Sequence, residues 1–204
     1  GASQGDIYTL NVNTLAQALL VRANAFSQAS IDWASVSPDR TKIALTAQGG
    51  SASPTADVYW YDLPTGTAHV LYEDTPDEYQ DWQAEWIDNE RVSWSHNSSR
   101  GLVNNFGIVW KSIHSTAGVG TYDGVLVPFA PGTVGLASFL PAFDRMVYTR
   151  FSVPNARSRA LSSGVERIIS PFRLQSRYAM ILVDTYCPGD FNLDGGVDGD
   201  DVIE

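Results

Sequence analysis

The residues with the clearest chemistry lie in the last fifteen positions of the 204-residue chain. Side chains with oxygen atoms alternate from Asp190 to Asp194, Gly195 follows at the sixth position, and Asp201 stands at the twelfth. Calcium takes about six to eight oxygen ligands, so alternate side chains must converge from a tightly turned backbone. The spacing therefore predicts a calcium-binding loop. The expected direct ligands are Asp190, Asn192, Asp194, Asp201 and the backbone carbonyl of Gly196, with Asp198 acting through a water molecule.

The flanking segments indicate which kind of calcium loop this is. Cys187-Pro188-Gly189 precedes the loop, and because proline and glycine disfavour helix, we expect no entering helix. Residues 200–204 begin like a helix with acids at its positive end. A loop of the EF-hand type with only an exiting helix, closed by Asp201 instead of glutamate, resembles the first half of a type I dockerin. The resemblance covers about fifteen residues.

Membership of the dockerin family would imply a structural Ca²⁺ ion and attachment to a cohesin-like partner protein. Dockerins contain two such loops, whereas this sequence stops inside the first exiting helix. We therefore expect the chain to be a fragment, whose single loop binds calcium weakly. The alternative interpretation is a solvated acidic tail with glycine-rich turns.

Composition narrows the remaining classes of function. The formal net charge is −10, which argues against a nucleic-acid partner, because such a protein needs clustered lysine and arginine. No run of eighteen apolar residues is present, so we expect no membrane span. Cys187 is the only cysteine, so no disulfide can form within the chain. The dockerin resemblance implies an extracellular, secreted or cell-surface protein, in preference to a periplasmic one.

The residues before the calcium loop repeat with a period near fifty, which predicts a repeat architecture. A strand-turn-strand unit occupies residues 33–46, 86–95 and 140–149, with a weaker copy at 175–183. Hairpins lie between these units, at residues 6–20, 57–71 and 161–169, and a looser one near 108–113 has a long loop through Gly118, Gly120 and Gly124. Two hairpins per period give four strands, the content of one β-propeller blade. The sequence thus predicts an all-β fold, and only residues 15–21 could form a short helix.

The clearest copies resemble the WD40-like propellers of the TolB type. Blades of that family carry Ser-Pro-Asp-Gly-x-x-Ile-Ala-Phe followed by Asp-Ile-Tyr-x-x-Asp-x-x-Thr-Gly. Ser37-Pro38-Asp39 with Ile43-Ala44-Leu45 matches the first motif, with Arg40 in place of the glycine, and Asp57-Val58-Tyr59, Asp62 and Thr65-Gly66 match the second. The resemblance covers about residues 1–183. It implies a propeller domain over residues 1–186, followed by the calcium repeat over residues 187–204.

The number of blades has two interpretations. About four blades' worth of strands are present, and the chain enters mid-blade at Asp6 and leaves mid-blade near Val183. A four-bladed propeller could close if its first and last strands shared one blade. We favour the alternative, in which these blades are part of a larger propeller.

The blades contain no recognisable catalytic motif, and we assign no catalytic residue. His69, His96 and His114 lack the spacing of paired metal ligands, and no Gly-x-Ser-x-Gly or phosphate-binding loop is present. The acidic residues 73–78, followed by Tyr79, Trp82 and Trp86, could hold a carbohydrate or a peptide on a propeller face. We favour a solvated loop between blades, with both tryptophans turned into the core. Asn97-Ser98-Ser99 matches the short glycosylation pattern.

Two functions fit these features. We expect a secreted binding or scaffold propeller whose calcium-stabilised module attaches it to a cohesin-type partner, with a possible carbohydrate or protein ligand on the propeller face. The rival function is the propeller part of a polysaccharide-degrading enzyme that carries a dockerin. A glycoside hydrolase would need paired carboxyl groups that converge in the propeller funnel.

Overall fold

The computed structural model describes residues 5–26, 30–48, 56–73, 81–98, 105–132, 134–150 and 155–169. These residues form antiparallel β-strands with two short 3₁₀ turns, η1 (Ala23–Phe26) and η3 (Pro141–Phe143). The strands are β1 (Ile7–Leu10), β2 (Gln17–Val21), β3 (Ser30–Val36), β4 (Lys42–Gln48), β5 (Ala56–Asp62), β6 (Thr67–Tyr72), β7 (Asp81–Trp86), β8 (Arg91–Asn97), β9 (Asn105–Ser112), β10 (Gly124–Pro131), β11 (Val134–Leu140), β12 (Arg145–Arg150), β13 (Asn155–Ala160) and β14 (Glu166–Ile168).

Three four-stranded sheets follow the predicted fifty-residue period. Blade 1 has the strand order β3-β4-β5-β6, blade 2 the order β7-β8-β9-β10, and blade 3 the order β11-β12-β13-β14. Every neighbouring pair is antiparallel. Each blade therefore combines one strand-turn-strand unit with one hairpin, as the sequence predicts. The weaker copy at residues 175–183 lies outside the described residues.

The first hairpin forms a two-stranded sheet of its own, in which Leu10 pairs with Gln17. Its second strand, β2, covers most of residues 15–21, so the short helix that this apolar stretch could have formed is not present. Strand pairing satisfies the backbone groups of β2 along its length, and a stripe of seven residues is too short to make a stable helix by itself.

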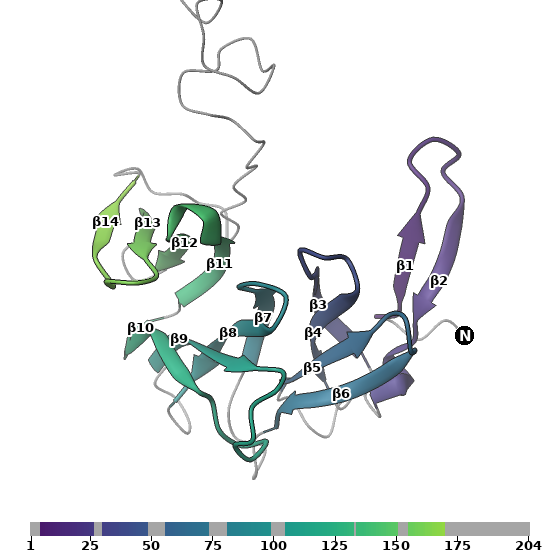
Figure 1. The fold of residues 1–204 in the computed structure, drawn as a ribbon, viewed down its shortest axis with the longest axis horizontal. Helices are drawn as coiled ribbons and strands as arrows, with labels where there is room; N and C mark the ends of the chain where they lie inside the picture. Colours follow the sequence, from purple (N-terminus) through teal and green to yellow (C-terminus); the bar gives the residue numbers. More distant parts are fainter. Residues whose placement is uncertain are drawn as a thin grey trace, which may run out of the picture.

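The sheets succeed one another around an arc, and β3, β7 and β11 face its concave side (Figure 1). These three are the first strands of their blades, and β7 lies against both β3 and β11. A bulge interrupts the pairing of each of them with the next strand, after Ile31 in β3, after Trp82 in β7 and after Gly135 in β11. Such bulges bend a strand and increase its twist, which suits the tightly packed inner positions of a propeller.

The hydrophobic core lies between the sheets. One cluster joins blade 1 to blade 2, and includes Tyr72 from β6 and Trp94 from β8. A second cluster joins blade 2 to blade 3, where Phe106 lies in the same cluster as Tyr148. A third joins β2 and η1 to blade 1, with Phe26 against Tyr59. Burial of each such side chain contributes roughly 1.5–3 kcal/mol, so the blades stabilise one another through their facing surfaces.

Tight turns connect the first two strands of each blade. In blade 1, the Asp39 carboxylate accepts hydrogen bonds from the Ser37 hydroxyl at 2.6 Å and from the Thr41 backbone N–H at 3.0 Å. Arg40 has φ = 61°, the left-handed conformation for which glycine is preferred. The TolB-type motif carries glycine at this position, and the backbone geometry explains why.

No helical turn in the described ranges is long and apolar enough to span a membrane.

Candidate functional site

The calcium-loop residues predicted from the sequence lie outside the described part of the chain. Asp190, Asn192, Asp194, Gly196, Asp198 and Asp201 therefore remain a prediction, as does the boundary between residues 186 and 187. Within the described ranges, no three histidine, cysteine, aspartate or glutamate side chains gather closely enough to hold a metal ion.

Glu85 is an acid whose surroundings shift its pKa strongly. It lies on β7, in the seam between blades 1 and 2, and the Trp33 indole N–H donates to its Oε1 at 3.1 Å. Burial raises the pKa of the Glu85 carboxyl to about 7, and the hydrogen bond from Trp33 offsets only part of that rise. A carboxyl group whose pKa lies near neutrality can both accept and donate a proton at physiological pH.

A second acid, Asp32, lies on the neighbouring inner strand next to Trp33. Its carboxylate accepts a hydrogen bond from the Ser30 hydroxyl at 3.3 Å, and partial burial raises its pKa. Asp32 and Glu85 thus come from β3 and β7, the two inner strands that lie side by side. We call Asp32, Trp33 and Glu85 the inner-strand site.

Further hydrogen bonds in this seam connect backbone and side chains of both blades. The Ser35 hydroxyl donates to the Ala84 carbonyl at 2.9 Å, and the Trp86 indole donates to the Ser35 carbonyl at 3.3 Å. At the turns below the strands, the Asp39 backbone N–H donates to Asn89 Oδ1 at 2.9 Å. Trp33 and Glu85 of the inner-strand site are consequently held in position by both blades.

A buried histidine–aspartate pair lies at the other end of β7. His96 Nδ1 is 2.7 Å from Asp81 Oδ1, and both side chains are almost completely excluded from solvent. The rings of Tyr72, Tyr122 and Phe129 surround the imidazole, with centroids 5.4 to 5.8 Å away. Sequence reasoning missed this pair, because no motif spacing connects residues 81 and 96.

The remaining histidines and tryptophans named in the sequence analysis lie in different surroundings. His69 stacks on Trp60 with ring centroids 4.0 Å apart, and His114 is exposed. Trp86 is buried as expected, whereas Trp82 is 37% exposed and only partly packed, against Phe106, so the expectation for Trp82 is only partly met.

Asn97 is buried and accepts a hydrogen bond from the Asn105 N–H at 3.1 Å, so its amide is not presented for glycosylation. Of the acidic stretch 73–78, only Glu73 lies in the described part of the chain.

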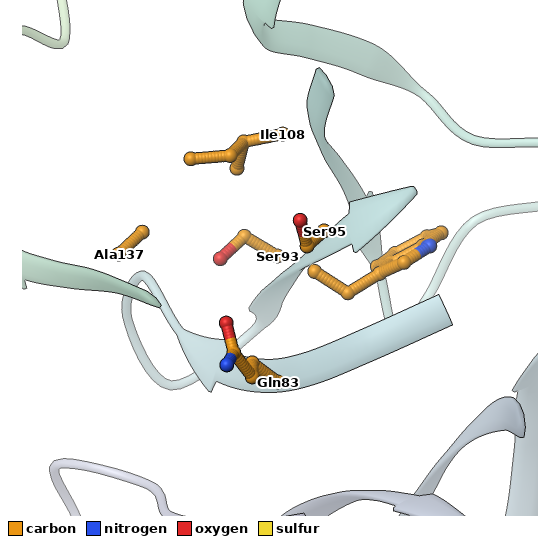
Figure 2. A pocket seen from close by; sticks show the side chains of 6 residues that line it. Gln83, Ser93, Ser95, Ile108 and Ala137 are labelled. Atoms are coloured by element: carbon orange, nitrogen blue, oxygen red, sulfur yellow. The ribbon is translucent and has the colours of Figure 1, made fainter. Parts of the chain in front are cut away.

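A small gap separates the face of blade 2 from β11 (Figure 2). About 170 Å³ of space lies among its lining side chains, part of it open to solvent, and none of it admits a water-sized sphere. Its lining residues are Gln83, Ser93, Trp94, Ser95, Ile108 and Ala137. Gln83 has φ = 61° at the bulge of β7. We interpret this gap as a packing seam where the bulge separates two blades, because a ligand pocket needs several hundred Å³.

Comparison with known proteins shows the fold alone. No protein-family profile matches the sequence, and no curated protein is significantly similar to it. The structure of TolB from Acinetobacter baumannii superposes with a TM-score of 0.56 at 17% identity, and covers 79% of this chain and 36% of TolB. An oligogalacturonate lyase in complex with manganese gives a TM-score of 0.54 at 12% identity over 82% of this chain and 46% of the lyase. A prolyl endopeptidase gives 0.51 at 12% identity over 82% of this chain and 23% of the peptidase.

These similarities establish a TolB-like β-propeller fold for the described strands. The chain spans less than half the length of each of these three proteins. None of the comparisons bears on the dockerin resemblance.

Proposed function

We propose that this chain is a binding scaffold: a TolB-like propeller joined to a calcium-stabilised, dockerin-like segment that attaches it to a cohesin-type partner. The observation that supports a scaffold is the use of polar groups on the inner strands. Trp33, Glu85 and Ser35 all bond across the seam between blades 1 and 2. Such a seam fixes the blades as a rigid support, on which loops and edges present a ligand surface.

Calcium has a structural role in this proposal. The carboxylates of Asp190, Asp194 and Asp201 repel one another in the free loop, and the ion supplies the free energy that draws them together. We also propose that the protein works outside the cytoplasm, at the cell surface or in the cell envelope. Extracellular calcium modules commonly bind with dissociation constants of about 10⁻⁴ to 10⁻³ M, so a single weak loop is adequate there.

Calorimetric titration of the chain with calcium tests the proposal. Asp190→Ala and Asp194→Ala should each weaken binding by about tenfold or more, because each removes a direct oxygen ligand. Asp200→Ala is the matched control, since Asp200 lies in the same segment at the eleventh position, which is not a ligand position of the motif. Equal affinities in all three variants would refute the calcium loop. Capture by an immobilised cohesin domain, with and without a chelator, then tests the partner.

The inner-strand site supports a second candidate, part of a polysaccharide-degrading enzyme. A carboxyl group with a pKa of about 7 is suited to general acid–base catalysis, and Asp32 supplies another carboxyl on the adjoining strand. The oligogalacturonate lyase shares the fold, although fold alone does not carry an activity. Incubation with neutral and acidic polysaccharides should release shorter products from the wild-type chain and none from Glu85→Gln if this alternative holds.

A further inference from the structure

The hairpin of β1 and β2 carries no charged side chain, and its turn exposes large apolar residues. Residues 7–21 contain no aspartate, glutamate, lysine, arginine or histidine, although the chain as a whole has a net charge of −10. Val12 is 79% exposed and Leu15 72%, the highest values among the large apolar side chains of the described ranges. Figure 1 shows this turn projecting away from the three blades. The further exposed apolar residues of the hairpin are Tyr8, Leu10, Leu19 and Leu20.

Packing between blades does not account for an apolar turn at this position. By the sequence repeat, the hairpin of β5 and β6 in blade 1 is equivalent to that of β1 and β2. Blade 1 has packed neighbours on both sides, and yet residues 64–67 of its turn are exposed. That turn has the sequence Pro-Thr-Gly-Thr, whereas the first hairpin places Val12 and Leu15 there. A neighbouring blade beside β1 and β2 would therefore leave these two side chains in solvent.

The backbone of the turn is already hydrogen-bonded within the hairpin. The Asn11 N–H donates to the Ala16 carbonyl at 2.9 Å, and the Leu15 N–H donates to the Asn11 carbonyl at 2.7 Å. The Asn11 side-chain oxygen accepts hydrogen bonds from the Asn13 and Thr14 N–H groups, both at 3.0 Å. The Ala16 N–H donates to Thr14 Oγ1 at 3.4 Å. An unpaired backbone donor is costly in an apolar medium, so a turn that pairs these five donors internally is suited to leave water.

We propose that this turn inserts into the surface of a lipid bilayer with neutral headgroups, and that Val12 and Leu15 enter its apolar layer. A protein interface has a polar rim around its apolar centre, and this hairpin supplies no charge for such a rim. Tyr8, which is 50% exposed, would lie further from the tip, at the headgroup level that tyrosine favours. The net charge of −10 opposes binding to an anionic surface, so neutral lipid is the better match.

The inference is independent of the calcium loop, and it adds a second partner to the proposed scaffold. An insertion of this size gives weak and reversible attachment. A single myristoyl chain binds a bilayer with an association constant of about 10⁴ M⁻¹, and we expect at most a similar value here. Binding is therefore to be measured at millimolar lipid.

Flotation of the whole chain with phosphatidylcholine vesicles, in the presence of a chelator, tests the insertion. The wild type should float with the vesicles at low salt and also at about 1 M salt, because an apolar attraction is not screened. Val12→Thr/Leu15→Asn should lower the partition constant by about tenfold or more, because apolar groups that would enter the lipid are lost. Asparagine suits position 15, since Leu15 has φ = 58°, a left-handed conformation that asparagine tolerates.

The matched control is Val165→Thr/Ile168→Thr, which removes apolar groups of blade 3 that are 54% and 58% exposed. It should change the partition constant by less than about twofold, because these positions lie outside the inserted turn. Equal losses in the two double variants would overturn the proposal. Failure of the wild type to bind neutral vesicles, or binding that requires anionic lipid, would overturn it as well.

A polarity-sensitive fluorophore measures the insertion at a single position. In a Cys187→Ser background, Leu15→Cys and Val165→Cys each provide one attachment site for the dye. Emission of the dye at position 15 should shift to shorter wavelength when phosphatidylcholine vesicles are added, and emission at position 165 should not. Equal shifts at both positions would contradict insertion by the turn. A shift at position 15 that grows with protein concentration in the absence of lipid would also overturn the proposal, since the occupant would then be a second copy of the chain.

Discussion

Glu85 shows that a repeat fold brings together side chains that are far apart in the sequence. Its partner Trp33 lies 52 residues earlier, close to one period of the repeat, so the two residues occupy nearby positions on successive inner strands. The period predicted successive four-stranded blades, in which β3 and β7 occupy equivalent positions. It did not predict which side chains would meet, because the bulges after Ile31 and Trp82 shift the pairing in each strand.

The raised pKa of Glu85 predicts a specific dependence of stability on pH. In the unfolded chain the carboxyl titrates near 4.5, and in the folded chain at about 7. Between these values the folded state retains a proton that the unfolded state has lost, so the free energy of unfolding falls as pH rises from about 4.5 to 7. Glu85→Gln keeps the acceptor for the Trp33 N–H without the charge. It should leave stability unchanged at pH 4 and increase it by about 1–3 kcal/mol at pH 8.

Urea denaturation at pH 4, 6 and 8 measures this effect. Asp62→Asn, a change of the same charge type at the half-buried end of β5 in blade 1, is the control and should show no such pH-dependent gain. A gain in Glu85→Gln that is equal at all three pH values would show that burial does not perturb this carboxyl.

Arg40 adopts a backbone conformation that costs free energy for residues other than glycine. The TolB-type motif has glycine at this position, and Arg40 has φ = 61°. A left-handed conformation costs an L-residue roughly 1–2 kcal/mol. Glycine avoids this cost, but it loses more conformational entropy on folding, which offsets part of the gain. Arg40→Gly should therefore stabilise the protein by up to about 1 kcal/mol, seen as a higher midpoint of thermal unfolding. Arg40→Ala removes the same side chain but keeps the penalty, so a gain from both variants would exclude the backbone explanation.

At the scale of elements, turn and strand patterns were sufficient to locate the described hairpins. The Pro-Thr-Gly turn after β5 and the Asp144 turn before β12 lie at the positions that the sequence predicts.

The contact made by the loop over residues 113–123 was not predicted. This loop reaches back to blade 1, where the Glu73 N–H donates to the Val119 carbonyl at 3.4 Å. Lys111 is buried beneath it and donates to the Gly118 carbonyl at 2.7 Å, and burial lowers the Lys111 pKa. No periodicity indicates such a long-range contact from a loop.

Gly107 on β9 lies where β9 and β10 pack closely, and a substitution there tests this packing. A Cβ atom at Gly107 would lie 2.8 Å from the Val127 carbonyl oxygen and 2.9 Å from the Phe129 ring, whereas one at Gly118 would meet nothing within 4 Å. Gly107→Ala must displace backbone of the neighbouring strand and should destabilise the protein by about 1–3 kcal/mol. Gly118→Ala is the matched control and should be close to neutral. Chemical denaturation of the two variants compares them directly, and equal stabilities would contradict the packing of β9 against β10.

At the scale of the molecule, the sequence predicted the architecture better than the site. The four-strand period, the order of the blades and the all-β class are confirmed, because they depend on turn residues and alternation that each repeat carries itself. The buried Asp81–His96 pair and the inner-strand site were missed, because both depend on how strands meet in three dimensions. The calcium loop is a local motif that the sequence can define alone, and its ligands remain a prediction.

Polar connections between blades 1 and 2 predict that these two blades open together. They are joined by hydrogen bonds from Trp33, Ser35, Trp86 and Asp39. Between blades 2 and 3, Arg150 Nη2 donates to the Pro128 carbonyl at 3.4 Å. In repeat architectures stability is approximately a sum of unit and nearest-neighbour terms, so a weaker seam opens first. Each net hydrogen bond is worth about 0.5–1.5 kcal/mol.

Native-state hydrogen exchange should therefore show blades 1 and 2 as one cooperative unit, with amides of β12 and β13 exchanging through an opening that is at least about 1 kcal/mol easier. Ser35→Ala removes the hydrogen bond to the Ala84 carbonyl. It should lower the protection of β4 and β8, and so reduce the difference in opening free energy between these strands and β12. Thr121→Ala, which removes a hydroxyl of similar size from an exposed loop of blade 2, should leave it unchanged. If β4, β8 and β12 were protected to the same extent in the wild type, the three blades would unfold as a single unit, and the polar bonds of the first seam would have no separate effect on cooperativity.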